Sequence, residues 1–276
     1  MLRHPCFDHK AHRVVGRLHL PVAPRCNIKC AYCEQGIGCV NESRPGVAGE
    51  VILPEEAISY VERALSFEPR LEVIGIAGPG DALANEETFV ALKAVKDRFP
   101  ELKICLSTNG LALPESLPKM LEVGVEFVSV TVNFISPEVG AKLVRWVKAQ
   151  DLLKGEEAAY FLTTKQLEGI TLAAQAGLRV KVNTVLVPEV NEKEIPLIAK
   201  EVAQAGASLM NIIPLIPLGE FSNHRAPTQK ELNRARAKAA KYIPQFLVCK
   251  RCRADAVGVP GLADENLFSI KNAVSV

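Results

Sequence analysis

The residues with the clearest chemical potential are eight cysteines, at positions 6, 26, 30, 33, 39, 105, 249 and 252. Three of them, Cys26, Cys30 and Cys33, form a Cys-x3-Cys-x2-Cys run. Three thiolates this close in sequence can meet at one centre, but the run lacks the fourth ligand and the paired spacing of a structural zinc site. The spacing therefore favours a [4Fe–4S] cluster with one iron open to a ligand, over zinc and over ordinary buried cysteines.

The other five cysteines fall outside this run. Cys249 and Cys252 form a Cys-x2-Cys pair that can bind one metal centre. Cys105 lies on one face of a predicted strand with Ser107 and Asn109. His19 stands between leucines that face the other way, so its imidazole is expected to point inward. With Cys6 and Cys39, five thiols and this imidazole suffice for two further clusters with three protein ligands each. The ordinary alternatives are small buried cysteines and a hydrogen-bonded core histidine.

Polar and glycine-rich residues follow several predicted strands. Gly78, Pro79, Gly80 and Asp81 form a loop after the second strand, where glycines allow a backbone to approach a ligand closely. Ligands of parallel α/β folds bind at the carboxyl ends of strands, so the polar residues there are candidate contacts. These are Ser107, Thr108, Asn109, Asn133, Asn183 and Thr184. Each taken alone is also consistent with a turn or cap residue.

Six short apolar runs alternate with helical patterns and must position these groups. The predicted strands are 18–22, 71–76, 103–107, 127–132, 179–186 and 208–213. Helices are predicted to open at Pro54, Asn85, Ser136, Asn191 and Thr228, the last with a capping box, and one more is expected within 151–177. Six strand–helix units predict a parallel α/β fold, either an open partial barrel or a doubly wound sheet.

Composition and chain pattern bound the class of protein. Apolar residues make up 48% and charged residues 23% of 276, which excludes disorder and fibrous repeats. No apolar run reaches the length of a membrane span and the start lacks a signal-peptide pattern, so we expect a cytoplasmic chain with no membrane partner. One domain over 1–276 is expected, with extensions at 1–16 and 244–276 around a core at 17–243.

The cysteine run, with Tyr32 before its last cysteine and the glycine-rich loop after the second strand, resembles the radical S-adenosylmethionine (SAM) superfamily. This resemblance implies a partial (βα)6 TIM-like barrel, a [4Fe–4S] cluster on Cys26, Cys30 and Cys33, and SAM chelated by its open iron. It also implies that the loop at Gly78, Pro79, Gly80 and Asp81 binds the amino group of SAM, although Gly-Pro-Gly-Asp replaces the usual Gly-Gly-Glu. The expected further SAM contacts are Ser107, Asn109, Asn133 and Asn183.

More specific motifs are similar to the NifB family of nitrogenase cofactor maturases. They are residues 4–7 (HPCF), 16–24 (GRLHLPVAP), 39–47 (CVNESRPGV) and 249–258 (CKRCRADAVG). This resemblance spans nearly the whole chain and is to a compact form, without the NifX-like domain of many bacterial members. It implies that two [4Fe–4S] clusters are fused, with a SAM-derived carbide and an added sulfur, into an eight-iron precursor of the nitrogenase cofactor.

The NifB resemblance also implies site residues. Six residues match the positions expected to hold the two precursor clusters: Cys6, His19, Cys39, Cys105, Cys249 and Cys252. We expect His19 and Cys105 on one cluster and Cys249 and Cys252 on the other, with Cys6 and Cys39 divided between them. Glu42 is a candidate proton acceptor and Arg44 a candidate hydrogen-bond donor to sulfides or SAM, against the alternative of a surface ion pair.

Partners are indicated only by charge. Residues 225–253 carry nine Lys or Arg and one acidic residue, and their two aromatics, Tyr242 and Phe246, do not alternate with the cations as nucleic-acid stacking would favour. Beyond a solvated helix face, these cations, Lys250, Arg251 and Arg253 among them, can offset cluster charge or dock an acidic carrier protein. An iron–sulfur donor protein and a reductant such as ferredoxin are also expected. The alternative functions are a radical SAM enzyme for an organic or peptide substrate with electron-transfer clusters, and a non-catalytic iron–sulfur scaffold.

Overall fold

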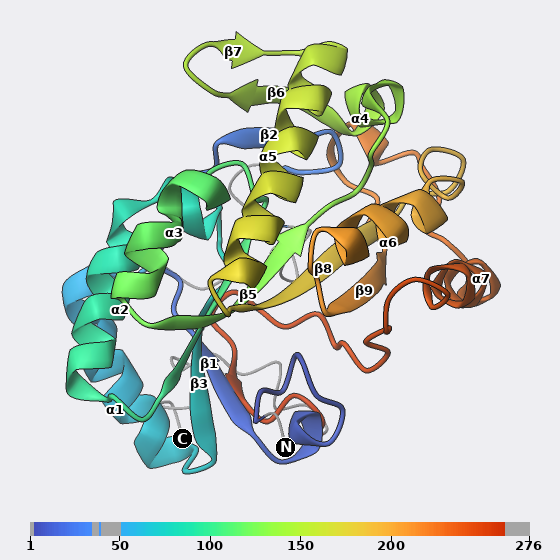
Figure 1. Ribbon diagram of the computed structural model, residues 1–276. Helices are drawn as coiled ribbons and strands as arrows, with labels where there is room; N and C mark the ends of the chain where they lie inside the picture. The colour runs from blue at the N-terminus through green and yellow to red at the C-terminus, as the bar shows by residue number, and fades with distance from the viewer. Residues whose placement is uncertain (1–2, 35–38, 40–50, 263–276) are drawn as a thin grey trace.

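A curved seven-stranded sheet forms the centre of the computed structural model, which describes residues 3–34, 39 and 51–262 (Figure 1). The strand order is β10-β1-β3-β4-β5-β8-β9, parallel throughout except that β10 runs antiparallel to β1. The bounds are β1 Gly16–His19, β3 Leu71–Ile76, β4 Lys103–Thr108, β5 Val125–Thr131, β8 Arg179–Leu186, β9 Leu209–Pro214 and β10 Val257–Gly258. The parallel strands follow one another in chain order, so the sheet lacks the order reversal of a doubly wound fold. The partial (βα)6 barrel is confirmed.

Helices between the strands cover the outer side of this sheet (Figure 1). They are α1 Ala57–Phe67, α2 Glu86–Arg98, α3 Leu113–Glu122, α4 Pro137–Leu143, α5 Gly155–Gln175, α6 Ile195–Gln204 and α7 Gln229–Ala239. Short 3-10 helices occupy Ala11–Arg13, Pro54–Glu56, Ala82–Ala84 and Gly219–Phe221. The helix expected within 151–177 is confirmed as α5, and the capping box of Thr228 and Glu231 opens α7. Within the described residues, no helix combines the length and apolarity needed to cross a bilayer.

The side chains of the central strands alternate between the two faces of the sheet. Ile74, Ile104, Val128 and Val182 belong to the large apolar core that the strands share with the helices. Their neighbours in the strands face the other way, toward the barrel interior, and the inner face is much more polar than the outer one. The period of two residues per strand therefore separates a structural face from a chemical face.

A second, three-stranded antiparallel sheet closes one end of the barrel. It consists of β2 Ile28–Cys30, β6 Val144–Lys148 and β7 Leu152–Leu153 in the order β2-β6-β7. A separate apolar cluster that includes Ile28, Tyr32 and Phe134 supports it. Neither this sheet nor β10 was predicted, because strands of two to five residues give too little alternation to be recognised.

Several expected boundaries differ from the structure. The first strand is β1 at Gly16–His19 rather than 18–22, since Pro21 has no backbone N–H to donate to the sheet. The helix expected to open at Asn191 begins at Ile195, because the Asn191 amide bonds to the backbone of Asn133, Val185 and Val187 instead. Ser136 stands at the N-cap of α4, but its side chain makes no cap hydrogen bond there.

Candidate functional site

The three cysteines of the run surround β2: Cys26 precedes it, Cys30 is its last residue and Cys33 lies in the turn that follows. Cys30 is buried in β2, while Cys26 and Cys33 are half-buried on either side. The turn is closed by the Cys33 amide, which donates to the Cys30 carbonyl at 3.1 Å, and by the Lys29 ammonium, which donates to the Cys33 carbonyl at 2.6 Å. The small sheet, through the pairing of β2 with β6, therefore supports the cysteine run.

The residues after β9 contact this loop and hold it in place. The Ala31 carbonyl accepts from the Glu220 amide at 3.0 Å, and a Cβ at Gly219 would stand 2.8 Å from the same oxygen. Gly219 has φ +56°, a conformation that glycine adopts without strain. The close approach of two backbones fixes the turn that carries Cys30 and Cys33.

Tyr32 is buried beside the cysteines and explains the place of Asn133. The Asn133 amide donates to the Tyr32 hydroxyl at 2.7 Å, and its oxygen accepts from the Val185 amide at 2.8 Å. Burial raises the pKa of Tyr32, and negative charge on Cys30 would raise it further. Asn133 therefore joins the cysteine loop to β8.

Asn109 braces the same loop from β4. Its amide nitrogen donates to Asn27 Oδ1 at 2.7 Å and lies 3.8 Å from Cys26 Sγ, and its oxygen accepts from the Leu111 amide at 2.9 Å. Burial is the main cause that raises the pKa of the Cys26 thiol, followed by the negative charge of Asp81. A metal must therefore displace a firmly held proton from Cys26.

The glycine-rich loop presses against the segment that leads into the cysteines. Gly80 donates its amide to the Ala23 carbonyl at 2.6 Å, and a Cβ there would stand 2.2 Å from the Arg25 carbonyl oxygen. Only glycine allows this contact, so the loop and the cysteine segment form one unit.

The Asp81 carboxylate is buried and accepts hydrogen bonds from groups within the protein. Its carboxylate accepts from the Leu83 amide at 3.0 Å, the Asn109 amide at 2.5 Å and the Thr108 hydroxyl at 3.1 Å. Burial raises its pKa to about 6, against the lowering effect of these hydrogen bonds. Asp81 thereby locks the loop after β3 to the end of β4.

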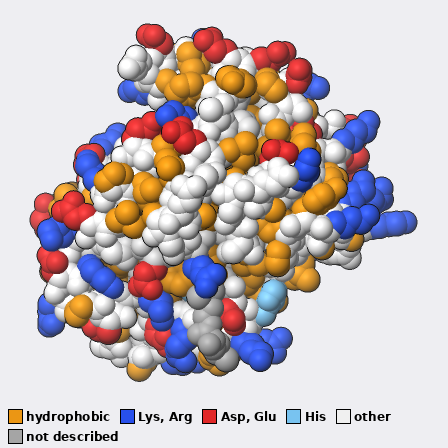
Figure 2. Space-filling model, in the orientation of Figure 1, with side chains coloured by type: hydrophobic (Ala, Val, Ile, Leu, Met, Phe, Trp, Pro, Cys, Tyr) orange, Lys and Arg blue, Asp and Glu red, His pale blue; other side chains and the backbone are white. Residues whose placement is uncertain are grey.

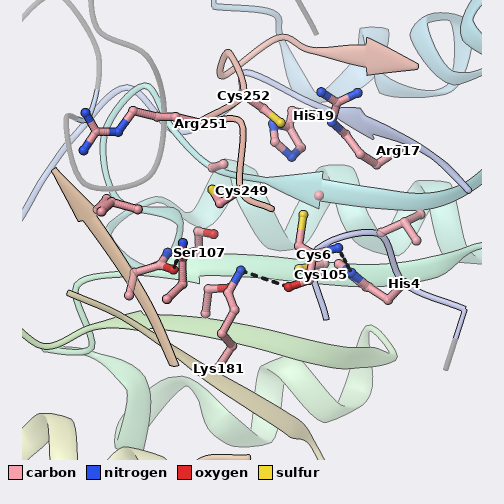
Figure 3. Close-up of a pocket in the computed structure, with 17 residues that line it drawn as sticks. His4, Cys6, Arg17, His19, Cys105, Ser107, Lys181, Cys249, Arg251 and Cys252 are labelled. Carbon is pink, nitrogen blue, oxygen red and sulfur yellow. Dashed lines mark hydrogen bonds between the residues drawn. The ribbon is translucent and has the colours of Figure 1, made fainter. Parts of the chain in front are cut away.

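A cavity with an empty volume of about 630 Å³ occupies the inner face of the sheet (Figure 3). Five of the six predicted auxiliary ligands line it together: Cys6, His19, Cys105, Cys249 and Cys252. They come from the N-terminal extension, β1, β4 and the segment before β10, which the fold brings to one place. The sixth, Cys39, is half-buried, does not line this cavity, and contributes to the raised pKa of Tyr32. Glu42 and Arg44 lie outside the described residues.

Strand register explains the places of His19 and Cys105. His19 pairs with Gly75 and Gly75 with Cys105, so all three belong to one layer of the inner face. A Cβ at Gly75 would stand 3.0 Å from His19 Cδ2, so this glycine leaves room for the imidazole. Ser107 and Asn183, two of the candidate SAM contacts, also line the cavity, in the next layers.

His19 is oriented by the C-terminal segment. Its Nδ1 lies 2.8 Å from the Arg253 carbonyl, which can only accept, so Nδ1 carries the proton and Nε2 keeps a lone pair. Arg253 in turn forms a two-bond pair with Asp255, at 2.7 and 2.9 Å. Burial lowers the pKa of His19 to about 4, so the ring is neutral and suited to bind a metal.

The charged side chains among the described lining residues of the cavity are all positive. Arg17, Lys181 and Arg251 line it, and no Asp or Glu occurs among its described lining residues. Arg17 and Lys181 are 1% and 5% exposed. Arg17 donates to the Gly258 carbonyl at 2.6 Å and Lys181 to the Cys6 carbonyl at 3.4 Å, so both cations are held at the cavity wall. The positive charge of this lining favours an anionic occupant.

The sequence analysis named Arg251 beside the Cys-x2-Cys pair but missed Arg17, Lys181 and two polar residues. Lys181 lies within the strand predicted at 179–186, and Arg17 directly precedes the strand predicted at 18–22, so a charged residue beside buried apolar ones was the available signal. Ser129 and Asn211 also line the cavity, in register with Lys181 and Asn183. The two-residue period would have placed both on the inner face.

The exposed cations of α7 form a separate surface. Figure 2 shows Lys and Arg gathered at the side of the molecule where α7 lies, and Lys230, Arg234, Lys238 and Lys241 are exposed. Of the three cations beside the Cys-x2-Cys pair, Arg251 lines the cavity, Lys250 is exposed and Arg253 is paired with Asp255.

Comparisons with known proteins assign the family. The model of the radical SAM superfamily matches residues 20–202. The FeMo cofactor biosynthesis protein NifB of Methanocaldococcus jannaschii is 48% identical over 260 residues, covering 93% of this chain and 86% of that protein. The chain belongs to the NifB family of radical SAM enzymes. NifB proteins of Chlorobaculum tepidum and Klebsiella pneumoniae are both 39% identical, and the chain covers 62% and 57% of their lengths.

Solved structures agree with this NifB-family fold. Methylornithine synthase superposes with a TM-score of 0.54 at 13% identity, covering 96% of this chain and 81% of that one. At this identity the likeness supports the partial barrel alone. The radical SAM assignment implies one [4Fe–4S] cluster and SAM. The three cysteines of the run fit that cluster: all lie in a loop braced from three sides, and Asn109 already approaches the sulfur of Cys26.

Proposed function

We propose that this chain is a maturase of the nitrogenase cofactor that fuses two [4Fe–4S] substrate clusters, with insertion of a SAM-derived carbide and a sulfur, into an eight-iron precursor. The curated NifB relatives are described as FeMo cofactor biosynthesis proteins. The observation that carries the proposal is the single cavity that five candidate ligands and three cations share, with no carboxylate among its described lining residues.

The shared cavity favours fusion over electron transfer. Clusters that only relay electrons need no common space, whereas clusters to be joined must sit within bonding reach of each other. Five thiols and one imidazole supply three ligands for each of two clusters, which leaves an iron of each open. Open corners permit a reaction between clusters, and complete ligand sets would oppose it.

Cys26, Cys30 and Cys33 would hold the cluster that binds SAM, which supplies methyl transfer and hydrogen-atom abstraction. The loop from Gly78 to Gly80 would present backbone oxygens to the amino group of SAM, with Asp81 fixing the loop from inside. Ser107 and Asn183 face the cavity and would contact SAM or the substrate. Asn109 and Asn133 hold the cysteine loop in place. Glu42 would accept protons from the methyl carbon, and Arg44 would donate to sulfides or to SAM.

The substrate clusters would be bound by the cavity residues together with Cys39, which lies outside the cavity lining. His19 and Cys105, in one layer of the sheet, hold one cluster, and Cys249 and Cys252 hold the other. Cys6 and Cys39 complete the two sets, one in each. Arg17, Lys181 and Arg251 offset the negative charge of sulfides and thiolates. A neutral imidazole among thiolates gives one cluster its most easily released bond, which suits a substrate that must move.

Partners of the proposed pathway follow from the chemistry. An iron–sulfur donor protein must load the cavity, a reductant such as ferredoxin must supply electrons, and a carrier must accept the product. The exposed cations of α7 offer an acidic carrier a complementary surface. A cytoplasmic location would provide the reducing conditions that free thiols need.

The proposal is tested by anaerobic reconstitution of the full chain. About twelve iron atoms per chain are expected, four for each of three clusters. With SAM and dithionite, the loaded chain should release both S-adenosylhomocysteine and 5′-deoxyadenosine. Release of 5′-deoxyadenosine without S-adenosylhomocysteine would favour a radical SAM enzyme for an organic substrate, and no SAM cleavage would overturn every enzymatic proposal.

A further inference from the structure

Two histidines line the cavity, and the protein orients their rings in opposite ways. His19 directs Nδ1–H to a carbonyl, which leaves a lone pair on Nε2. At His4 the Cys6 backbone N–H donates to Nδ1 at 3.1 Å, so Nδ1 must be the acceptor (Figure 3). In a neutral ring the proton of His4 therefore resides on Nε2. His19 is prepared as a ligand and His4 as a hydrogen-bond donor.

The surroundings of His4 keep its ring fixed. The side chain is 1% exposed and packs against Phe7 and Phe127, with ring centroids 4.7 and 4.3 Å away. Because the Cys6 N–H donates to Nδ1, that nitrogen must keep its lone pair, and the tautomer set by Cys6 holds.

The Nε2–H of His4 has no acceptor among the described residues. A buried donor without an acceptor destabilises a protein, so such a group calls for a ligand. His4 lines the cavity and is joined through Nδ1 to the backbone of Cys6, one of the candidate cluster ligands. Sulfides and thiolates are the acceptors that a cluster on Cys6 would bring.

We propose that His4 donates its Nε2–H to a sulfur of the substrate cluster that Cys6 holds. This inference rests on the proposed function and adds a positioning residue to it. Because one ring bonds both the Cys6 backbone and the cluster, it fixes the cluster's rotation about the Cys6 thiolate. A hydrogen bond to sulfur also stabilises the more negative, reduced cluster, so it raises the reduction potential.

Two substitutions separate the roles of the two ring nitrogens. His4→Asn places an amide oxygen near the position of Nδ1 and keeps an acceptor for the Cys6 amide, but it lacks the distal donor. His4→Gln places an N–H near the position of Nε2 and restores that donor. His12 provides the matched control, since it is 4% exposed, has Nδ1 on the Pro5 carbonyl and does not line the cavity.

The readouts are iron content and an EPR-monitored redox titration of the auxiliary clusters, in full-length chains that also carry Cys26→Ala, Cys30→Ala and Cys33→Ala. We expect His4→Asn to keep its iron and shift the auxiliary potential downward, while His4→Gln and His12→Asn keep the parent value. Pulsed EPR should retain the nitrogen coupling of the cluster in His4→Asn and lose it in His19→Ala.

Other results would overturn the inference. Equal shifts in His4→Asn and His4→Gln, or no shift in either, would show that Nε2–H does not bond the cluster. Loss of nitrogen coupling in His4→Asn would make His4 a ligand instead. A parent chain that loads no auxiliary iron would overturn the proposed function, and the inference with it.

Discussion

The cysteine loop and the barrel cavity assemble their ligands in opposite ways. The loop draws Cys26, Cys30 and Cys33 from eight consecutive residues and supports them with one short sheet. The cavity draws its ligands from positions between Cys6 and Cys252. Strand register aligns His19 with Cys105, and the segments at the two ends of the chain bring the others. The loop can therefore be damaged or repaired locally, whereas the cavity exists only once the whole barrel has formed.

The largest effect is expected from a substitution that removes a ligand of the cysteine loop and leaves the cavity intact. Cys30→Ala removes a buried thiolate of the SAM cluster, so about four iron atoms per chain should be lost. Release of 5′-deoxyadenosine should fall by at least the roughly 100-fold that outer-shell substitutions cost metal sites. Iron analysis and chromatography of products measure both. Loss of all iron would contradict the independence of the two regions.

The converse substitution removes a ligand of the cavity and leaves the cysteine loop intact. His19→Ala should lower iron content by about four atoms while the SAM cluster remains and still cleaves SAM when reduced. His12→Ala serves as control, because His12 is buried nearby but does not line the cavity. An unchanged iron count and spectrum in His19→Ala would remove His19 from the ligand set.

Substitution of alanine for one glycine in each region adds a single methyl group and tests the difference between the cysteine loop and the cavity. Gly80→Ala places Cβ 2.2 Å from the Arg25 carbonyl, a backbone collision that should cost about 1–3 kcal/mol and disturb SAM binding. Gly75→Ala meets only the His19 ring, at 3.0 Å, so stability should change less and auxiliary loading should fall. Thermal unfolding and iron analysis of both variants test this. The reverse pattern would contradict the assignment of the two regions.

Iron loading should depend on pH in a direction set by the thiols. Burial raises the pKa of Cys6 to about 11 and also raises that of Cys26, so both thiols are protonated in the metal-free chain at neutral pH. Binding releases these protons, and loading should improve between about pH 7 and 9. His19, with a pKa of about 4, contributes no such dependence in that range. Loading titrations with proton-release measurements would reveal an opposite or absent trend.

The smallest effect lies outside both regions. Thr228→Ala removes the N-cap of α7 and should cost about 1 kcal/mol of stability. Iron content and SAM cleavage should not change. Denaturant unfolding and iron analysis together make the check, and lost iron would mean that α7 supports the cavity.

The sequence predicted those parts of the fold that repeat a strong local pattern. β3 and β8 match their predicted bounds, because long apolar runs between turns identify buried strands. The triplet was recognisable for the same reason, since its spacing is local. His19 was expected to point inward from its two leucine neighbours, and the structure places it in the cavity.

The rest depended on contacts between distant residues. Nothing local to Asn109 indicates that it reaches Asn27 and Cys26, because that contact follows from the packing of β4 against the small sheet. Asp81 was expected at the SAM site, but its hydrogen bonds to Thr108 and Asn109 become visible only when β3 and β4 pair. The opposite tautomers of His4 and His19 also depend on folded backbone contacts. His19 bonds to the carbonyl of distant Arg253, and His4 accepts from the amide of Cys6, where the chain turns back on itself.

The clusters of the cavity should receive carbon from SAM, and the fate of the methyl carbon decides whether they do. The reconstituted full chain would be incubated with dithionite and SAM labelled at its methyl carbon, and the iron–sulfur product separated from the protein. We expect the label to accompany the iron of that product. Label recovered only in intact SAM, or in a methylated small molecule or peptide, would show that the clusters receive no carbon.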